Sequence, residues 1–294
     1  MKLLSFGEIV WDICGEKKTL GGAPLNLAAH AALQGGDVWL LSAVGEDPLG
    51  KETMERMREL GIHTEYIDEH STFPTGQCTV TLDANGVPSY RLSENAAYDH
   101  IPVPDDLLEP FDVLAFETLA LRSEQNRERL KQLLRNNRFS HIFTDLNIRA
   151  PFYSKEIIEF CLAHATIIKI SEEELPIVTE QISGKCFPLA DAAKLIKRNY
   201  PQAQLLLITQ GEKGSLCYDF QADRVYRCEA VPATVVSTVG AGDSYGATFL
   251  TWYFRTRDVM RSMTHASKVS AFVVSVQEAI PKDTKDFLKT AGLD

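Results

Sequence analysis

The stretch Thr238-Val239-Gly240-Ala241-Gly242-Asp243 places small residues and a carboxylate where an extended run over residues 230–236 gives way to a helical pattern over 244–253. Small residues at such a turn leave backbone N–H groups bare. These groups, together with the helix dipole, bind anions. The stretch therefore predicts an anion site at a helix N-terminus, with a side-chain carboxylate in its first turn.

Two roles are open for that carboxylate. Asp243 can take a proton from a substrate hydroxyl while the N–H groups of Gly240, Ala241 and Gly242 stabilise charge on a transferring phosphoryl group. Alternatively, Asp243 only complements the dipole of a helix whose glycines allow a tight turn. The stretch alone does not decide between the two.

A second glycine-rich turn, Gly21-Gly22-Ala23-Pro24-Leu25-Asn26, leads into a helical pattern over residues 24–34. Its glycines permit close approach of the backbone, and its proline suits a first helical turn. Asn26 offers both donors and an acceptor, and Asp12 lies upstream. If Asp12 and Asn26 converge from their separate segments, they suit adjacent sugar hydroxyls; singly, they are more typical of a turn residue and a solvated helix residue.

Short apolar runs alternate with amphipathic stretches through most of the chain, which is typical of strands and helices built around a parallel sheet. The predicted strands cover residues 2–6, 38–44, 113–116, 141–145, 166–170 and 204–209. The predicted helices cover residues 24–34, 49–60, 123–136 and 154–164, and the last fifty residues read almost wholly helical. We expect one large α/β domain over residues 1–294.

Residues 75–92 break this alternation. They read as two strands around Asp83-Ala84-Asn85-Gly86, and Asn-Gly is a strong hairpin signal. Residues 9–14 add a further extended piece. The pattern predicts an antiparallel flap beside the parallel sheet, either a lid that keeps water from a reacting centre or an ordinary edge hairpin.

Composition excludes several classes of protein. The chain has 294 residues, 40 acidic against 30 basic side chains and a net charge of −10, which argues against a nucleic-acid partner. Glu8 and Asp12 interrupt the apolar start where a signal peptide needs its apolar centre, and no run approaches the roughly 18 apolar residues of a membrane span. The six cysteines show no zinc-type spacing. We expect a cytoplasmic protein without a membrane partner.

The two glycine-rich stretches together resemble the ribokinase-like (PfkB-type) carbohydrate kinases, the family of ribokinase, fructokinase and adenosine kinase. Three segments between them fit the family's VGxDxxG, DxNxR and TxGxxG elements: Gly45 to Gly50, Asp145 to Arg149 and Thr209 to Gly214. The resemblance covers nearly the whole chain. It implies a three-layer α/β/α sandwich with a mostly parallel central sheet and a small β-sheet lid formed by about residues 9–18 and 73–94.

The resemblance also implies an activity, the ATP-dependent transfer of a γ-phosphoryl group to a sugar hydroxyl with Mg²⁺. Asp243 would be the catalytic base, and the backbone of Gly240, Ala241 and Gly242 the anion hole. Matched residue by residue, the sugar site would comprise Asp12, Gly22, Asn26 and Arg149, the nucleotide site Lys169, Thr209, Gly211, Gly214 and Ser267, and the metal site Glu174.

Two departures from the family pattern affect these expectations. Ser237 precedes Thr238 where family members often have an aspartate near a monovalent cation, which puts activation by K⁺ in doubt. Ser171 replaces the asparagine of the family's NxxE element, which ends at Glu174. Because Ser-x-x-Glu is also an N-capping box, Glu174 either orients hydrated Mg²⁺ or stabilises the start of a helix.

The acceptor is predicted from finer features. The opening Gly7-Glu8-x-x-Trp11-Asp12 followed by Gly-Gly-Ala-Pro-x-Asn most resembles fructokinases, so fructose leads over ribose, 2-keto-3-deoxygluconate and adenosine. A phosphorylated acceptor would want cations, for which Lys17, Lys18 and Arg91 are candidates of unknown position. A nucleoside would want an aromatic wall, which Phe73, Tyr90 or Tyr98 would supply.

A sugar- or nucleotide-binding protein without catalysis is the alternative from another class. Retention of Asp243 with both flanking glycines weighs against it. The family resemblance also suggests a homodimer paired through the lid.

The segment from Gly45 to Lys51 looks like a P-loop. Glu52 stands where a P-loop has the hydroxyl residue that binds Mg²⁺, so the sequence argues against a P-loop.

Overall fold

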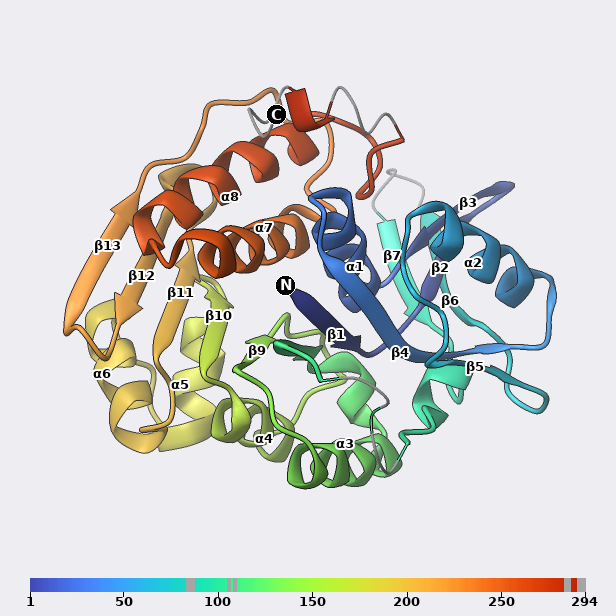
Figure 1. Cartoon of the computed structure of the whole chain (residues 1–294), viewed down its shortest axis with the longest axis horizontal. Coiled ribbons are helices and arrows are strands. Elements are labelled where there is room, and N and C mark those ends of the chain that lie inside the picture. The colour runs from blue at the N-terminus through green and yellow to red at the C-terminus, as the bar shows by residue number, and fades with distance from the viewer. Residues whose placement is uncertain (83–87, 105–106, 108–109, 283–286, 290–294) are drawn as a thin grey trace.

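A mostly parallel sheet forms the centre of the molecule. The computed structural model describes residues 1–82, 88–104, 107, 110–282 and 287–289, with only the backbone at 80–82 and 88–90. Within these residues, nine strands are ordered β13-β12-β11-β10-β9-β8-β1-β4-β5 (Figure 1). Neighbours from β11 to β5 are parallel, whereas β12 and β13 are antiparallel. The strands are β1 (Lys2–Phe6), β4 (Asp37–Gly45), β5 (Ile67–His70), β8 (Val113–Glu117), β9 (His141–Asp145), β10 (Ile167–Ser171), β11 (Leu205–Thr209), β12 (Ser215–Asp219) and β13 (Arg224–Cys228).

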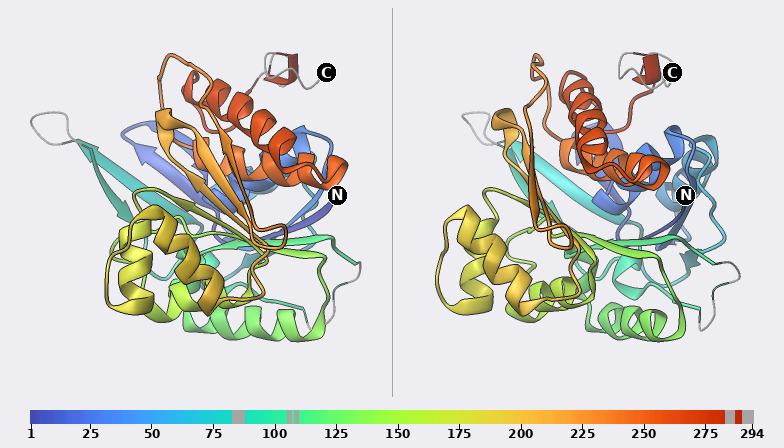
Figure 2. Two further views of the ribbon diagram at one scale, coloured as in Figure 1. Left: turned by 90° about the vertical axis from the view of Figure 1, so that its left-hand side faces the viewer. Right: turned by 60° about the vertical axis from the view of Figure 1, so that its left-hand side comes forward.

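Helices cover both faces of this sheet (Figure 2). Each face has its own buried apolar cluster. One cluster receives α1 (Ala23–Leu33), α2 (Pro48–Glu59), α7 (Ala241–Thr256) and α8 (Val259–Val274). The other receives α3 (Glu124–Asn136), α4 (Lys155–His164), α5 (Leu175–Ser183) and α6 (Leu189–Asn199). The buried strands read as continuous apolar runs because both their faces are covered. The predicted three-layer sandwich is confirmed.

A second, small sheet lies beside the central one. Four strands of the described backbone, β2 (Val10–Cys14), β3 (Lys17–Gly21), β6 (Gly76–Leu82) and β7 (Pro88–Leu92), are ordered β3-β2-β6-β7. The pairs β2–β3 and β6–β7 are antiparallel, and β2–β6 is parallel. The predicted hairpin strands are confirmed, while the turn predicted at Asp83 to Gly86 falls outside the described residues. We call this unit the small sheet.

The prediction that the last fifty residues are almost wholly helical is wrong. The extended run over residues 230–236 pairs with no strand in the described chain, although its valines favour pairing, because after β13 the chain leaves the sheet edge. Val235 and Val236 are accordingly exposed. The helical stretch ends at Val274, and residues 275–282 are not helical. Among the helices in the described part of the chain, none is both long and apolar enough to cross a bilayer.

Candidate active site

A row of charged side chains crosses the carboxyl ends of three neighbouring strands. Glu117 ends β8 and is in register with Asp145, which ends β9 and is in register with Lys169 of β10. The N-terminus of α7 lies against this row, since a Cβ added at Gly242 would be 3.1 Å from Nζ of Lys169. Ligands of parallel α/β sheets bind at this edge. The anion loop predicted from sequence therefore faces a buried cation.

Lys169 and Asp145 form a buried ion pair. The Nζ of Lys169 donates to Oδ2 of Asp145 at 2.5 Å, and both side chains are 4% exposed. Burial lowers the pKa of Lys169, but the surrounding carboxylates, Asp145 foremost with Glu174 and Asp243, together raise it above its ordinary value. Lys169 consequently stays positive beside the anion loop, where an isolated buried ammonium would lose its proton. A fixed cation at this position can neutralise charge on a transferring phosphoryl group.

The anion loop has the predicted geometry. Gly240 is the N-cap of α7 with φ of 79°, and a Cβ at this position would lie 2.6 Å from the Cβ of Ala279. Only glycine fits this left-handed, crowded position. The N–H of Ala241 donates to the carbonyl of Thr238 at 3.3 Å. In the described part of the chain the N–H groups of Gly240, Gly242 and Asp243 lack such an acceptor, so these donors are free for a ligand, whereas that of Ala241, which was predicted with Gly240 and Gly242, is not.

Asp243 is buried and held by Asn26. The Nδ2 of Asn26 on α1 donates to Oδ2 of Asp243 on α7 at 2.7 Å, and the residues are 4% and 7% exposed. Burial raises the pKa of Asp243, and the hydrogen bond from Asn26 opposes that rise. The two glycine-rich stretches singled out in the sequence thus meet through one hydrogen bond. A carboxylate so placed is equipped to accept a proton.

Glu117 joins Asp145 and Asp243 in a cluster that the sequence did not reveal. One oxygen from each of these carboxylates lies within 4.8 Å of the other two. Oε2 of Glu117 accepts from Nδ2 of Asn147 at 2.7 Å, while Oε1 is buried without a partner in the described residues. Burial raises the pKa of Glu117 well above its ordinary range, and the neighbouring carboxylates add to this rise. Oxygen ligands of this kind fit Mg²⁺.

Glu174 is the residue predicted to bind the metal, and both of its carboxylate oxygens accept hydrogen bonds from backbone N–H groups. Oε1 accepts from the N–H of Ile148 at 2.5 Å, and Oε2 accepts from the N–H of Ser171 at 2.8 Å. The second bond closes the turn before α5, whose N-cap is Glu174 itself, so the capping box predicted at Ser171 does not form. Glu174 therefore fastens the turn after β10 to the loop after β9, and its metal role stays a prediction.

The residues predicted to hold the sugar come from three elements. Asp12 lies on β2 of the small sheet beside Cys78, Arg149 follows β9, and Gly22 is the N-cap of α1 with φ of 112°. Burial raises the pKa of Asp12, as it does for Asp145 and Asp243, and the positive charge of Arg149 opposes the rise in all three. Arg149 thus lies within electrostatic reach of Asp12, predicted to hold the sugar, and of Asp243, predicted to be the base.

The predicted nucleotide residues lie further along the sheet. Thr209 ends β11, and Gly211 and Gly214 lie in the following loop with φ of 56° and 94°. A Cβ at Gly214 would collide with the carbonyl of Cys228, whose Sγ lies 3.5 Å from Oγ of Ser267 on α8. Gly214 and Ser267 therefore come together around Cys228.

A hydrogen bond ties this nucleotide region to the catalytic helix. Tyr245, two residues after Asp243, shares a hydrogen bond of 2.7 Å with Ser215, the residue after Gly214. Both side chains are buried. The position of α7 is thereby coupled to the loop predicted to line the nucleotide.

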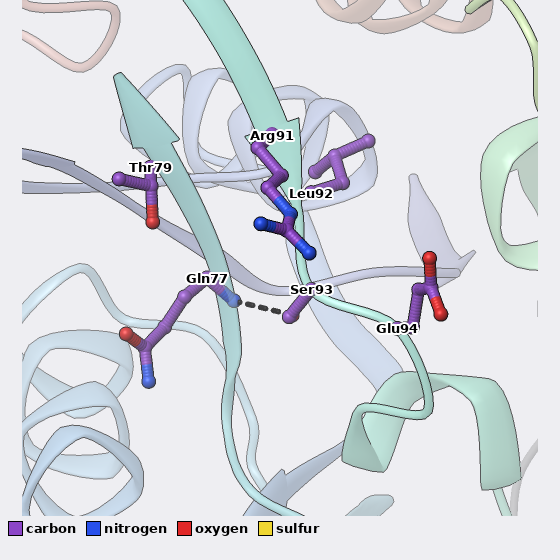
Figure 3. A pocket seen from close by; sticks show the side chains of 6 residues that line it. All are labelled: Gln77, Thr79, Arg91, Leu92, Ser93 and Glu94. Carbon is purple, nitrogen blue, oxygen red and sulfur yellow. Dashed lines mark hydrogen bonds between the residues drawn. The ribbon is translucent and has the colours of Figure 1, made fainter. Parts of the chain in front are cut away.

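The small sheet presents different residues on its two faces. Asp12 is in register with Cys78, and Thr79, the next residue, is in register with Arg91. Because successive strand residues point to opposite faces, Arg91 lies on the face away from Asp12. There Gln77, Thr79, Arg91, Leu92, Ser93 and Glu94 line a pocket (Figure 3). Lys18, in register with Ile13, also lies on this face and pairs with Glu52 of α2.

The VGxDxxG segment anchors the small sheet. Oδ1 of Asp47 accepts from the N–H of Gly50 and the hydroxyl of Thr75, and Oδ2 accepts from the N–H of Thr75, each at 2.8 Å. Asp47 is thereby both the N-cap of α2 and the fastening of the chain that enters β6. The segment is structural, in agreement with the sequence argument against a P-loop.

Comparisons with known proteins agree with this geometry. The model of the pfkB family of carbohydrate kinases matches residues 5–285. A fructokinase of Klebsiella pneumoniae is 30% identical over 267 residues, covering 85% of this chain and 83% of that protein. A fructokinase of Escherichia coli is 27% identical, covering 95% of each chain.

Solved structures share the fold. The structure of a fructokinase with bound ATP from Xylella fastidiosa superimposes with a TM-score of 0.81 at 21% identity, covering 99% of both chains. A sugar kinase from Pyrococcus horikoshii in complex with ATP gives a TM-score of 0.81 at 24% identity, again covering 99% of both chains. With its family elements gathered around one edge of the sheet, the chain belongs to the pfkB family of carbohydrate kinases.

Proposed function

We propose that this sugar kinase transfers the γ-phosphoryl group of Mg·ATP to a hydroxyl of fructose. The observation that carries the proposal is the meeting of a buried base with an anion site. Asp243, held by Asn26, lies in the first turn of the helix whose Gly242 lies against Nζ of Lys169. A base, an anion hole and a fixed cation are the parts that phosphoryl transfer needs, since the reaction depends chiefly on positioning and charge stabilisation.

In this mechanism Asp243 accepts the proton of the sugar hydroxyl. The hydroxyl oxygen forms a bond to the γ-phosphorus as the bond from that phosphorus to the β,γ-bridging oxygen breaks, and ADP leaves with the electron pair. The N–H groups of Gly242 and Asp243 and the ammonium of Lys169 stabilise the charge on the equatorial oxygens. Glu117 and Asp145 would hold Mg²⁺, which neutralises polyphosphate charge when bound.

The proposed sugar site is completed by the small sheet. Asp12, Gly22, Asn26 and Arg149 would contact the acceptor, with residues 9–18 and 73–94 acting as a lid that excludes water. Gly214 and Ser267, together with Thr209 and Gly211, would line the nucleotide. The same small sheet is the proposed surface of a homodimer, which light scattering on the purified protein would test.

Fructose is favoured by the relatives. Fructokinases from Klebsiella pneumoniae, Salmonella typhimurium and Escherichia coli are 27–30% identical to this chain, and a Vibrio cholerae fructokinase solved with fructose and ADP has the same fold at a TM-score of 0.78. An ATP-dependent 6-phosphofructokinase is 25% identical. Arg91 and Lys18 lie on the face of the small sheet away from Asp12, where they cannot neutralise a phosphate group on the sugar, and Lys18 pairs with Glu52. This position argues for an acceptor without a phosphate group.

The test is ADP release from Mg·ATP with fructose, ribose, 2-keto-3-deoxygluconate, adenosine and fructose 6-phosphate, each with and without K⁺. Fructose should give the highest kcat/KM. Potassium should change the rate little, because Ser237 stands where family members often have an aspartate near the monovalent cation. The hydroxyl of Ser237 accepts a hydrogen bond from the N–H of Val239. A preference for another acceptor would overturn the fructose assignment, and turnover with none would overturn the kinase assignment.

A further inference from the structure

Glu8 carries a buried carboxylate that the mechanism above does not use. It follows β1 and is 3% exposed, and the N–H groups of Glu8 itself and of Ala23 at the start of α1 lower its pKa against the larger rise that burial causes. Its Oε2 is buried and has no hydrogen-bond partner in the described residues. Leaving a buried acceptor unpaired is unfavourable, and more so if the acceptor is charged. A ligand that donates a hydrogen bond would remove this cost.

The surroundings of Glu8 place it in the proposed sugar site. The sugar-site residue Gly22 packs on it so closely that an added Cβ would lie 2.5 Å from the carbonyl oxygen of Glu8. Electrostatic interactions with Glu8 alter the pKa of Tyr98, and Asp243 and Arg149 alter that of Glu8. Three buried atoms of nearby side chains also lack partners in the described chain: Oδ1 of Asn26, the hydroxyl of Tyr98, and Nη1 of Arg122, whose other nitrogens pair with Asp99.

These open atoms define the ligand they would satisfy. Oδ1 of Asn26 accepts only, a carboxylate oxygen accepts only, and the tyrosine hydroxyl accepts or donates. A polyhydroxy compound supplies donors to all three. A phosphate or carboxylate group supplies acceptors and negative charge instead, which the carboxylates of Glu8 and Asp243 would repel. The cations near Glu8 are already matched by carboxylates, since Arg122 pairs with Asp99 and Arg149 opposes the pKa rise of both Glu8 and Asp243. Arg91 and Lys18 lie on the opposite face of the small sheet.

We propose that Glu8 determines acceptor specificity: its Oε2 accepts a hydrogen bond from a hydroxyl of a neutral sugar, and its charge excludes acceptors that carry a phosphate or carboxylate group. The inference rests on the proposed kinase function and adds to it the residue that selects the acceptor. Glu8→Gln and Glu8→Asp separate the two parts. Glu8→Gln keeps the shape and removes the charge, whereas Glu8→Asp keeps the charge and withdraws it by one methylene. Glu69→Gln, an exposed carboxylate on β5, is the control for a simple loss of charge.

The experiment measures kcat/KM for fructose and for fructose 6-phosphate at about pH 8.5, above the pKa of about 7 to which burial raises Glu8. Glu8→Gln should lower kcat/KM for fructose by about tenfold or more and lower the preference for fructose over fructose 6-phosphate by at least about tenfold. Glu8→Asp should lose fructose activity but keep rejecting the phosphate. Glu69→Gln should match the wild type.

Calorimetric titration of each variant with fructose and with ADP separates a specific effect from misfolding. Glu8→Gln should bind ADP as the wild type does and bind fructose more weakly. If the wild type turns over fructose and Glu8→Gln leaves the preference unchanged, the role of Glu8 is wrong while the kinase function stands. If the wild type phosphorylates no acceptor, the kinase function itself fails, and the role of Glu8 with it.

Discussion

Asn26 and Asp243 lie 217 residues apart in sequence, and their side chains meet at 2.7 Å in the interior of the molecule. The bond uses one amide proton of Asn26 and leaves its Oδ1 open. A single side chain therefore orients the proposed base and also faces the proposed sugar. Because α1 and α7 pack against each other, the two glycine-rich turns are fixed by the core as well as by this bond.

Replacing Asn26 should change the acidity of the base. The donor of Asn26 lowers the pKa of Asp243 against the larger effect of burial, so Asn26→Ala should raise that pKa. The acidic limb of the kcat/KM profile should then move to higher pH, with activity lowered by about tenfold at neutral pH. Asn199→Ala at the exposed end of α6 serves as the control. An unshifted limb in Asn26→Ala would mean that Asp243 is not the titrating group.

Removing Asp12 should separate the two substrates. The carboxylate of Asp12 is assigned to the sugar, so Asp12→Ala should raise KM for fructose by about tenfold to a hundredfold, the usual effect of losing a hydrogen bond to a charged group. KM for ATP should stay close to the wild-type value. Initial rates with each substrate varied in turn measure both constants. Equal increases would show that the sugar site has been misplaced.

The fold and part of the site can be predicted from the sequence because the residues that form them stand close together along the chain. The anion loop at Gly240 and its carboxylate stand together in sequence, as do the glycines before Asn26. Glu117 was missed because a single glutamate at the end of an apolar run has no pattern. Its partners Asp145 and Lys169 join it only through the register of neighbouring strands.

The same limit explains the other differences. The valines of residues 230–236 favour a strand, but a strand needs a neighbour, and pairing is decided by the whole sheet. The bond from the N–H of Ser171 to Glu174 joins residues three apart, so the sequence can suggest it. The bond from the N–H of Ile148 to Glu174 joins loops that are distant in sequence, so no local pattern predicts it. The open oxygen of Glu8 could be found only once the atoms around it were known.

Breaking the buried ion pair should destabilise the protein. Lys169→Met leaves Asp145 buried without its cation and should reduce the free energy of unfolding by about 3–5 kcal/mol. Adding Asp145→Asn should restore part of that loss because the remaining partner is then neutral. Denaturant unfolding of the wild type, of Lys169→Met, of Asp145→Asn and of the double variant measures this. If the loss of stability in the double variant equals the sum of the losses in the two single variants, the two residues are not coupled.

A buried histidine should make stability depend on pH. His30 is fully buried, its Nε2 lies 2.8 Å from the carbonyl oxygen of Ala279, and burial lowers its pKa to about 4. Below the ordinary value of 6.5 the unfolded chain binds a proton that the folded chain does not, so folding is weakened as pH falls from 6.5 toward 4.

The variant His30→Gln removes this titration. The stability advantage of the wild type over the variant should be largest above pH 6.5 and should shrink by about 2 kcal/mol at about pH 5. Paired denaturation curves at the two pH values measure the difference and cancel the titration of other groups. An equal advantage at both pH values would show that His30 is protonated in the folded protein.

The most direct test of the account replaces Asp243 by its amide. Asp243→Asn keeps the shape of the side chain and cannot accept the proton of the sugar hydroxyl. With fructose and Mg·ATP, the rate of phosphoryl transfer in a single turnover should fall by about a hundredfold or more, while the affinity for ATP stays unchanged. A variant that transfers the phosphoryl group at the wild-type rate would contradict the central claim that Asp243 is the base of a sugar kinase.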